Sequence, residues 1–469
     1  MLDDLIVALL CELGERVLAM RALLAEPVVA AKPQAHAVAA LLATGLDAVE
    51  ARLQRDVLTR PDRAAGRDDA ADRLRALADC GRALRALHGR LGLLAVRSDA
   101  GPVDIFLRKV RDDLGPSVDL PHPAVVLSDN DADDDTHDDA RPNGASRDDD
   151  VAEQLGGDLA AAGVAADMTG VEEPIVALPR IEAANPLSWP LLLPALARVY
   201  LRRGAGTDLG EGEAREGDMD GVIAVRLGGP AAFAARAAQA LIATPPDVPV
   251  WPALSRQAGL AETYAGGLGV PAHESGEGFE REAPHALFAR LLRRRDEALG
   301  HAAPNNIDPG QTAAAAHRRP ALPPPEVPTA AETALLLRKL ADGVPINAID
   351  APVPADFLDR LNGLENAAGF YDLIGPLEER PASLAAILGV GWLYKVRYSY
   401  PLFRAALRAE SDDTGADAGS DDTGADAGGT LRAALAAYRP HMVERDELLL
   451  QSIEAAHVQG IFARGKLDI

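Results

Sequence analysis

The sequence predicts a mainly α-helical protein with a small β-sheet, that is, an α+β fold dominated by helices. Alanine and leucine dominate the 469 residues, and aromatic residues make up only 4%, a composition that favours helices. Apolar residues recur at helical spacing over long stretches. Only two short runs, 124–127 and 174–178, predict strands. The chain is longer than a usual single domain, so we expect two or three units.

Residues 1–100 predict an N-terminal helical bundle. We expect its three helices over residues 2–26, 34–58 and 68–94. The first has acids among its apolar residues and no basic segment before them, which predicts an amphipathic helix and not a signal peptide. The third has leucines three, four and seven residues apart, the stripe of a bundle face. These leucines are Leu74, Leu77, Leu84, Leu87 and Leu91.

Residues 101–301 form the predicted central unit, which begins with a short helix over 102–114 and contains both strand candidates. An acidic, low-complexity insert at 128–150 separates the strands, and we expect it to be disordered and solvated. It lacks the glycine and the terminal glutamate of a calcium-binding loop. Further helices are expected over 191–201, over a stretch ending at Gly228-Gly229-Pro230, over 231–242 and over 284–299.

The segment from Asn185 to Phe233 resembles the zincin metallopeptidases. In that family an apolar helix carries His-Glu-x-x-His, and a second helix supplies the third zinc ligand from Glu-x-x-x-Asp. Glu216 and Asp220 stand at Glu-x-x-x-Asp here. The resemblance implies a zincin-like central α+β unit. The residues matching the family's introductory and closing phrases are Asn185, Pro186, Leu187, Trp189, Pro190, Leu192, Ala224, Arg226, Leu227, Gly229 and Pro230.

The positions that would carry the zinc chemistry depart from the family pattern. Pro194, Ala195 and Arg198 stand where the first histidine, the general base and the second histidine would be. A catalytic zinc needs three protein ligands with lone pairs, and these side chains supply none. The resemblance therefore implies a scaffold that has lost its zinc site and needs no cofactor. Arg198 could pair with Glu216 and replace the metal as a structural tie.

A Pro-rich linker at 302–328 precedes a helical C-terminal module at 329–469, which begins with a helix over 329–340. The module carries an aromatic group that predicts either a packed core or an interface. A perfect tandem of SDDTGADAG begins at Ser411, and we expect the insert 411–429 to be flexible. Helices over 431–438 and 443–462 complete the chain. The aromatic group consists of Trp392, Tyr394, Tyr398 and Tyr400.

The net charge of −24, with arginine as nearly every cation, indicates a halophilic source with a GC-rich genome. It argues against nonspecific binding to nucleic acid or anionic membranes. Cys11 and Cys80 predict buried thiols, and no apolar run is long enough to cross a bilayer, so we expect a cytoplasmic protein. The basic run 290–295 could bind phosphate, but an internal ion-pairing face is favoured.

We find no phosphate-binding loop, dinucleotide fingerprint or serine nucleophile elbow in the sequence. We therefore expect a catalytically inactive, peptidase-like protein that acts as a binding or scaffold subunit with protein partners, either in a complex or as an oligomer. One alternative is a purely structural helical assembly protein unrelated to peptidases. The other is an active metal-dependent hydrolase whose ligands are scattered residues such as His273, His285, Glu216 and Asp220.

Overall fold

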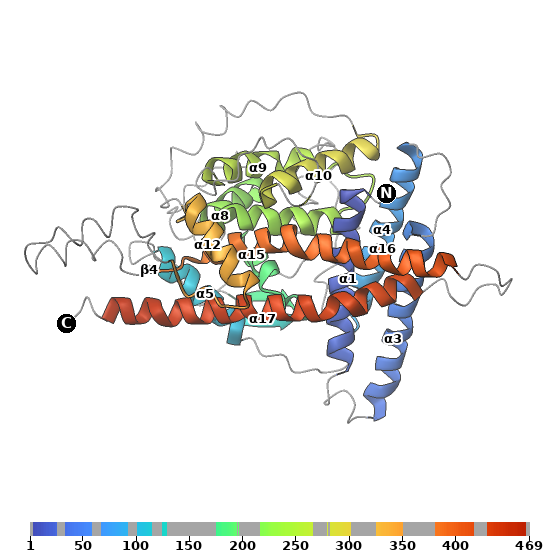
Figure 1. The fold of residues 1–469 in the computed structure, drawn as a ribbon, viewed down its shortest axis with the longest axis horizontal. Helices are drawn as coiled ribbons and strands as arrows, with labels where there is room; N and C mark the ends of the chain where they lie inside the picture. Colours follow the sequence, from blue (N-terminus) through green and yellow to red (C-terminus); the bar gives the residue numbers. More distant parts are fainter. Residues whose placement is uncertain are drawn as a thin grey trace, which may run out of the picture.

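The computed structural model describes thirteen stretches of the chain, and they are mostly helical (Figure 1). The described residues are 3–25, 33–58, 67–91, 101–114, 124–128, 175–194, 196, 216–265, 279, 282–301, 325–349, 380–416 and 429–465. The long helices are α1 (Asp4–Leu24), α3 (Pro33–Leu53), α4 (Arg67–His88), α5 (Gly101–Leu114), α8 (Glu216–Ala243), α9 (Trp251–Ala265), α10 (Pro284–Ala298), α12 (Ala330–Ala341), α15 (Leu384–Tyr394), α16 (Tyr400–Ala416) and α17 (Gly429–Gly465). None of them combines the length and the apolar character needed to cross a membrane.

Helix α1 packs against helices from both ends of the chain. It contacts α3 and α4 on one side and α8, α10, α16 and α17 on others. Its residues from Leu5 to Glu15 are all buried, including Glu12 and Glu15. The predicted amphipathic pattern therefore fails over Leu5–Glu15, because α16 and α17 cover the face that carries Glu12 and Glu15, whereas Asp4, Arg16 and Arg21 stay partly exposed.

The three predicted N-terminal helices correspond to α1, α3 and α4, which contact one another. Helix α3 continues into a π-helical turn, η1 (Gln54–Leu58). Leu74, Leu77, Leu84 and Leu91 are buried, as the apolar stripe predicts. The buried apolar residues of the described chain form one cluster that extends from α1 to α17. The division of the chain into separate units stays a prediction.

Two short strand pairs accompany the helices. Strand β1 (Ala124–Ser128) pairs in parallel with β2 (Ile175–Pro179), at the two positions where the sequence predicts strands. Strand β3 (Ala348–Ile349) pairs antiparallel with β4 (Arg380–Pro381). Pairs of this size do not establish a zincin-like unit, which stays a prediction.

The start of the predicted helix over 191–201 differs from the expectation, because its first two residues belong to a 3-10 helix. Residues Pro186–Leu192 form a 3-10 helix, η4, whose first turn is capped by the Asn185 side chain accepting from the Leu187 amide at 3.1 Å. Pro190 and Pro194 have no amide hydrogen, so neither can donate the backbone bond that an α-helix requires. Of the residues after Pro194, the structure describes only Leu196 in this stretch, and it is buried.

The C-terminal helices are longer than predicted. Residues 411–416 of the predicted flexible insert continue α16, and residues 417–428 lie outside the described residues. Helices expected over 431–438 and 443–462 are one helix, α17, with Pro440 inside it. A proline removes one backbone hydrogen bond, and packing of α17 against α5, α15 and α16 offsets that loss.

Candidate functional site

The positions that the zincin resemblance assigns to a lost zinc site are only partly described. Pro194 is half-buried, Ala195 and Arg198 lie outside the described residues, and Glu216 and Asp220 occupy the first turns of α8 with side chains that are not described. The predicted Arg198–Glu216 pair therefore stays a prediction. Within the described stretches, no group of three or more histidine, cysteine or acidic side chains could hold a metal.

The residues that match the zincin introductory phrase have core contacts. Trp189 is 1% exposed, and its indole N–H donates to the Glu182 carbonyl at 3.1 Å. Its ring packs edge-on against the ring of Phe106 of α5, with the two ring centroids 5.6 Å apart. Glu182 in turn accepts from the Arg16 guanidinium of α1 at 3.0 Å. This segment therefore joins η4 to α1 and α5. Core packing accounts for the presence of the residues that match the zincin phrase.

The scattered ligands of the hydrolase alternative are not brought together in the described chain. His273 lies outside it, and the side chains of Glu216 and Asp220 are not described. His285 is buried, and its Nε2 lies 2.8 Å from the Glu262 carboxylate. Burial lowers the pKa of His285, although Glu262 opposes that shift. One histidine with one carboxylate supplies at most two of the three protein ligands of a catalytic zinc.

The basic run on α10 is used internally. Arg290 donates to Glu282 at 3.0 Å, and Arg294 donates to Asp3, the residue that caps α1, at 2.7 Å. Arg295 is 2% exposed and donates to the carbonyl oxygens of Thr244 and Pro245 at 2.9 and 2.8 Å. For these three arginines the internal ion-pairing interpretation is confirmed.

The most prominent polar feature of the interior is a group of charged residues that we call the buried charge cluster: Glu12, Glu15, Lys395, Arg445 and Asp446. The Lys395 ammonium donates to Glu15 at 2.7 Å and also contacts Glu12. Arg445 donates to Glu15 at 2.8 Å and to Asp446 at 2.9 Å. The Lys395 and Arg445 side chains are 0% and 1% exposed. The cluster therefore joins α1 to Lys395 and to α17, with Asp446 half-buried at its edge.

Two tyrosines complete the hydrogen bonding of this cluster. The Tyr400 hydroxyl donates to Glu12 at 2.8 Å, and the Tyr438 hydroxyl donates to Glu15 at 2.6 Å. Lys395 begins a π-helical turn, η7 (Lys395–Ser399), between α15 and α16. π-helical turns often occur at functional positions. Here the turn places the Lys395 ammonium against both glutamates of α1.

The surroundings set the charge of each carboxylate in this cluster. Burial alone would raise the pKa of Glu15, but the Arg445 and Lys395 charges hold it well below its ordinary value. Burial raises the pKa of Asp446 to about 6, against the opposing effect of Arg445. Burial would lower the pKa of Lys395, but Glu12 and Glu15 raise it. A lysine held in its charged form has no lone pair for nucleophilic attack, so the cluster is a structural tie.

The predicted aromatic interface divides into core and surface residues. Trp392 and Tyr400 are 2% and 0% exposed, so their side chains belong to the core. The Lys395 ammonium lies over both rings, and the Trp392 and Tyr400 rings also pack against Phe288 and Phe279, respectively. Tyr394 is half-buried and stacks on His441 at 5.6 Å, and Tyr398 is 42% exposed.

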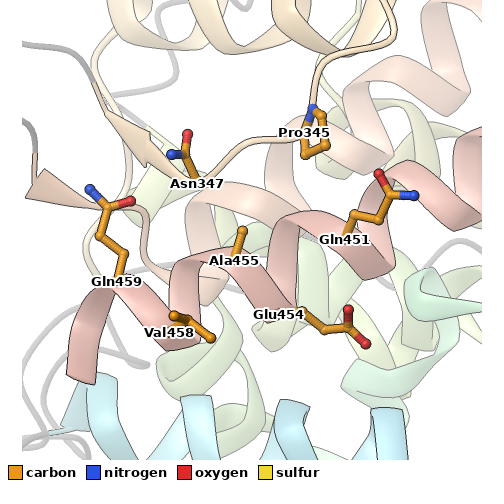
Figure 2. A pocket seen from close by; sticks show the side chains of 7 residues that line it. All are labelled: Pro345, Asn347, Gln451, Glu454, Ala455, Val458 and Gln459. Carbon is orange, nitrogen blue, oxygen red and sulfur yellow. The ribbon is translucent and has the colours of Figure 1, made fainter. Parts of the chain in front are cut away.

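A groove on α17, in the part of the chain that the structure describes, is accessible and has both polar and apolar lining residues. It has a volume of about 720 Å³ and lies between α17 and the segment that leads into β3 (Figure 2). Its side chains combine an apolar floor with three carboxamides and one carboxylate. The lining residues are Pro345, Asn347, Gln451, Glu454, Ala455, Val458 and Gln459.

Neither the groove nor the charge cluster was predicted from the sequence. The groove joins a segment without a motif to one face of α17. The cluster had a weak signal: glutamates inside an apolar run, and a lysine in a chain whose cations are nearly all arginine. Comparison with protein-family models, curated proteins and solved structures finds no match to this chain.

Proposed function

We propose that the protein is a non-enzymatic binding or scaffold subunit that acts on protein partners. Under this proposal, the resemblance to zincins reflects a peptidase-like scaffold without its zinc. One observation supports it most: the acidic and basic side chains most suited to chemistry are buried and paired with one another around Glu15. A catalytic group must reach its substrate, whereas the groove on α17 is accessible.

The exposed apolar residues near the groove support a binding role. Val458 and Ile461 on α17 are each 49% exposed, and Val344 at the start of the opposite wall is 47% exposed. Apolar side chains gathered beside polar ones are typical of protein interaction sites. The first alternative, a helical assembly protein unrelated to peptidases, is equally compatible with this surface. It differs from the proposal only in that its fold would have no relation to the peptidase fold.

The second alternative, a metal-dependent hydrolase, is favoured by one contact, the His285–Glu262 pair. Metal analysis of the full chain, purified at high salt without chelator, separates it from the proposal. We expect mass spectrometry to find no stoichiometric zinc. One zinc per chain would contradict the proposal and would direct attention to His285 and to the residues around it.

A capture experiment tests the binding role itself. Tagged full-length protein is cross-linked in an extract of its source, and the partners are quantified for wild type, Val458→Glu and Leu335→Glu. Leu335 is a matched control, because it is 38% exposed on α12 and does not line the groove. We expect a partner retained by the control and lost from Val458→Glu. Equal recovery from all three proteins would exclude the groove as the binding site.

A further inference from the structure

We propose that the groove on α17 binds an extended peptide segment of a partner protein, and that this segment carries a lysine or arginine. The inference rests on the binding function proposed above and specifies the chemistry of the bound partner. Three features support it: the rigidity of the groove, its carboxamides and its single charge.

The two walls of the groove are held together by a buried hydrogen bond. The amide of Ile346 donates to the Ser452 hydroxyl of α17 at 2.8 Å, and Ile346 is fully buried. Pro345 and Asn347, on either side of Ile346, therefore face the groove, as alternate residues of an extended chain do (Figure 2). On α17, the lining side chains from Gln451 to Gln459 share one helical face. The groove is thus formed before a partner binds.

The carboxamides favour a ligand with free main-chain groups. Asn347, Gln451 and Gln459 each offer a carbonyl acceptor and an amide donor, which can pair with the N–H and C=O of a peptide unit. These three side chains make no hydrogen bond with other residues in the described part of the chain. A helical ligand uses its main-chain groups internally, whereas an extended one leaves them free. The lining therefore suits an extended segment.

The charge of the groove selects a cation. Glu454 is the one charged residue of the lining, and within the described stretches it forms no ion pair. Ala455, Val458 and Pro345 provide apolar surface beside it. Lysine and arginine carry a positive head on an apolar stem, so one side chain can satisfy both surfaces. The net charge of −24 also disfavours an acidic segment.

The test uses photo-cross-linking from the groove of the full-length protein. The photoreactive residue p-benzoylphenylalanine replaces Val458, and the protein is exposed to seven-residue peptide mixtures with one fixed central residue. That residue is lysine, norleucine or glutamate, and a fourth mixture has lysine with N-methylated neighbouring peptide bonds. We expect the lysine mixture to cross-link most, with loss of yield for glutamate and for the methylated backbone. Glu454→Gln should reduce the lysine yield about fivefold, to the norleucine level, as expected for an exposed ion pair.

Each other outcome contradicts the inference in a distinct way. Equal yields from lysine and glutamate mixtures would overturn the charge rule, and an unaffected methylated mixture would overturn main-chain recognition. Cross-links within the chain or to a second copy would assign the groove to those occupants instead. Absence of peptide cross-links, with protein partners still captured through Val458, would refute the extended segment but leave the binding function standing. Loss of both would refute both proposals.

Discussion

Lys395 shows how a single residue can connect distant parts of this chain. Its ammonium contacts Glu12 and Glu15 of α1, and Glu15 precedes it by 380 residues in the sequence. Lysine offers three donors around a compact charge, whereas arginine offers a planar fork of a different shape. The buried position of Lys395 between two carboxylates accordingly suits lysine and would not accommodate arginine without rearrangement.

We expect Lys395→Met to lower the free energy of unfolding by about 3–5 kcal/mol, because it removes the buried cation of Glu12 and one of the two cations of Glu15, which keeps Arg445. Denaturant unfolding of the full chain measures the change. Lys339→Met, at a half-buried lysine on α12, is the control and should cost less than about 1 kcal/mol. Equal losses in the two variants would mean that the buried charge cluster does not contribute to folding.

Asp446 should make stability depend on pH. Its pKa in the folded protein is about 6, above the ordinary value of 3.8. The folded state therefore binds the proton more tightly, and this contribution to stability is fully present below pH 3.8 and is lost as pH rises through 6. Asp446→Asn should remove it, and the stability of the variant relative to wild type should rise by up to about 3 kcal/mol between pH 4 and pH 7.5.

Denaturant unfolding of both proteins across this pH range checks the prediction. The folded-state pKa of Glu15 is lowered, so its contribution is present above its ordinary value of 4.5 and is lost only as pH falls towards its folded-state pKa. Both proteins share that contribution, and taking their difference removes most of it. A difference that is constant with pH would contradict the shifted pKa of Asp446.

At the scale of the element, helix α8 depends on one glycine. Gly229 has φ of 64° and ψ of −156° inside the helix, directly before Pro230, and the chain kinks there. This backbone conformation is open to glycine and costly for residues with a Cβ atom. A Cβ at Gly229 would lie 3.5 Å from the nearest side-chain atom, so space is not the constraint. The kink therefore follows from backbone conformation, and it lets α8 pack against both α9 and α15.

Gly229→Ala should consequently destabilise the protein by about 1–3 kcal/mol through backbone strain. Gly259→Ala on α9 is the matched control: nothing lies within 4 Å of its added Cβ. In an exposed helical position alanine is better than glycine by about 0.5–1 kcal/mol, so this control should gain stability. Thermal unfolding measures the stability of both variants. A loss of stability in both would mean that an added Cβ atom is not tolerated at either position, and would contradict a specific effect of backbone strain at Gly229.

At the scale of the whole molecule, α1 holds both halves of the chain together. It contacts α3 and α4 on one side and α8, α10, α16 and α17 on others, and it carries both glutamates of the buried charge cluster. A single cluster of apolar side chains includes residues from all these helices. We therefore infer that the described helices depend on α1 for their common core.

Deletion of residues 1–26 should abolish cooperative unfolding of the remaining chain, because it removes a large part of the core, leaves Lys395 without Glu12 and Glu15, and leaves Arg445 without Glu15. Circular dichroism and calorimetry of wild type and the deletion would measure this. Removal of residues 417–428, which lie between α16 and α17, serves as a control that should keep a cooperative transition. A deletion lacking α1 that unfolds with an undiminished transition would favour the independent units predicted from the sequence.

The sequence alone determined where most helices and the β1 and β2 strands form, because their signals are local. Apolar spacing located α3, α4, α5, α10 and α12, and β-branched runs located the two strands. It could not predict the burial of α1, the charge cluster or the groove on α17. These depend on residues separated by hundreds of positions, such as Glu15 and Arg445. Periodicity reports which face of a helix is apolar, but only the tertiary structure decides which distant helix covers it and whether a charge finds its partner there.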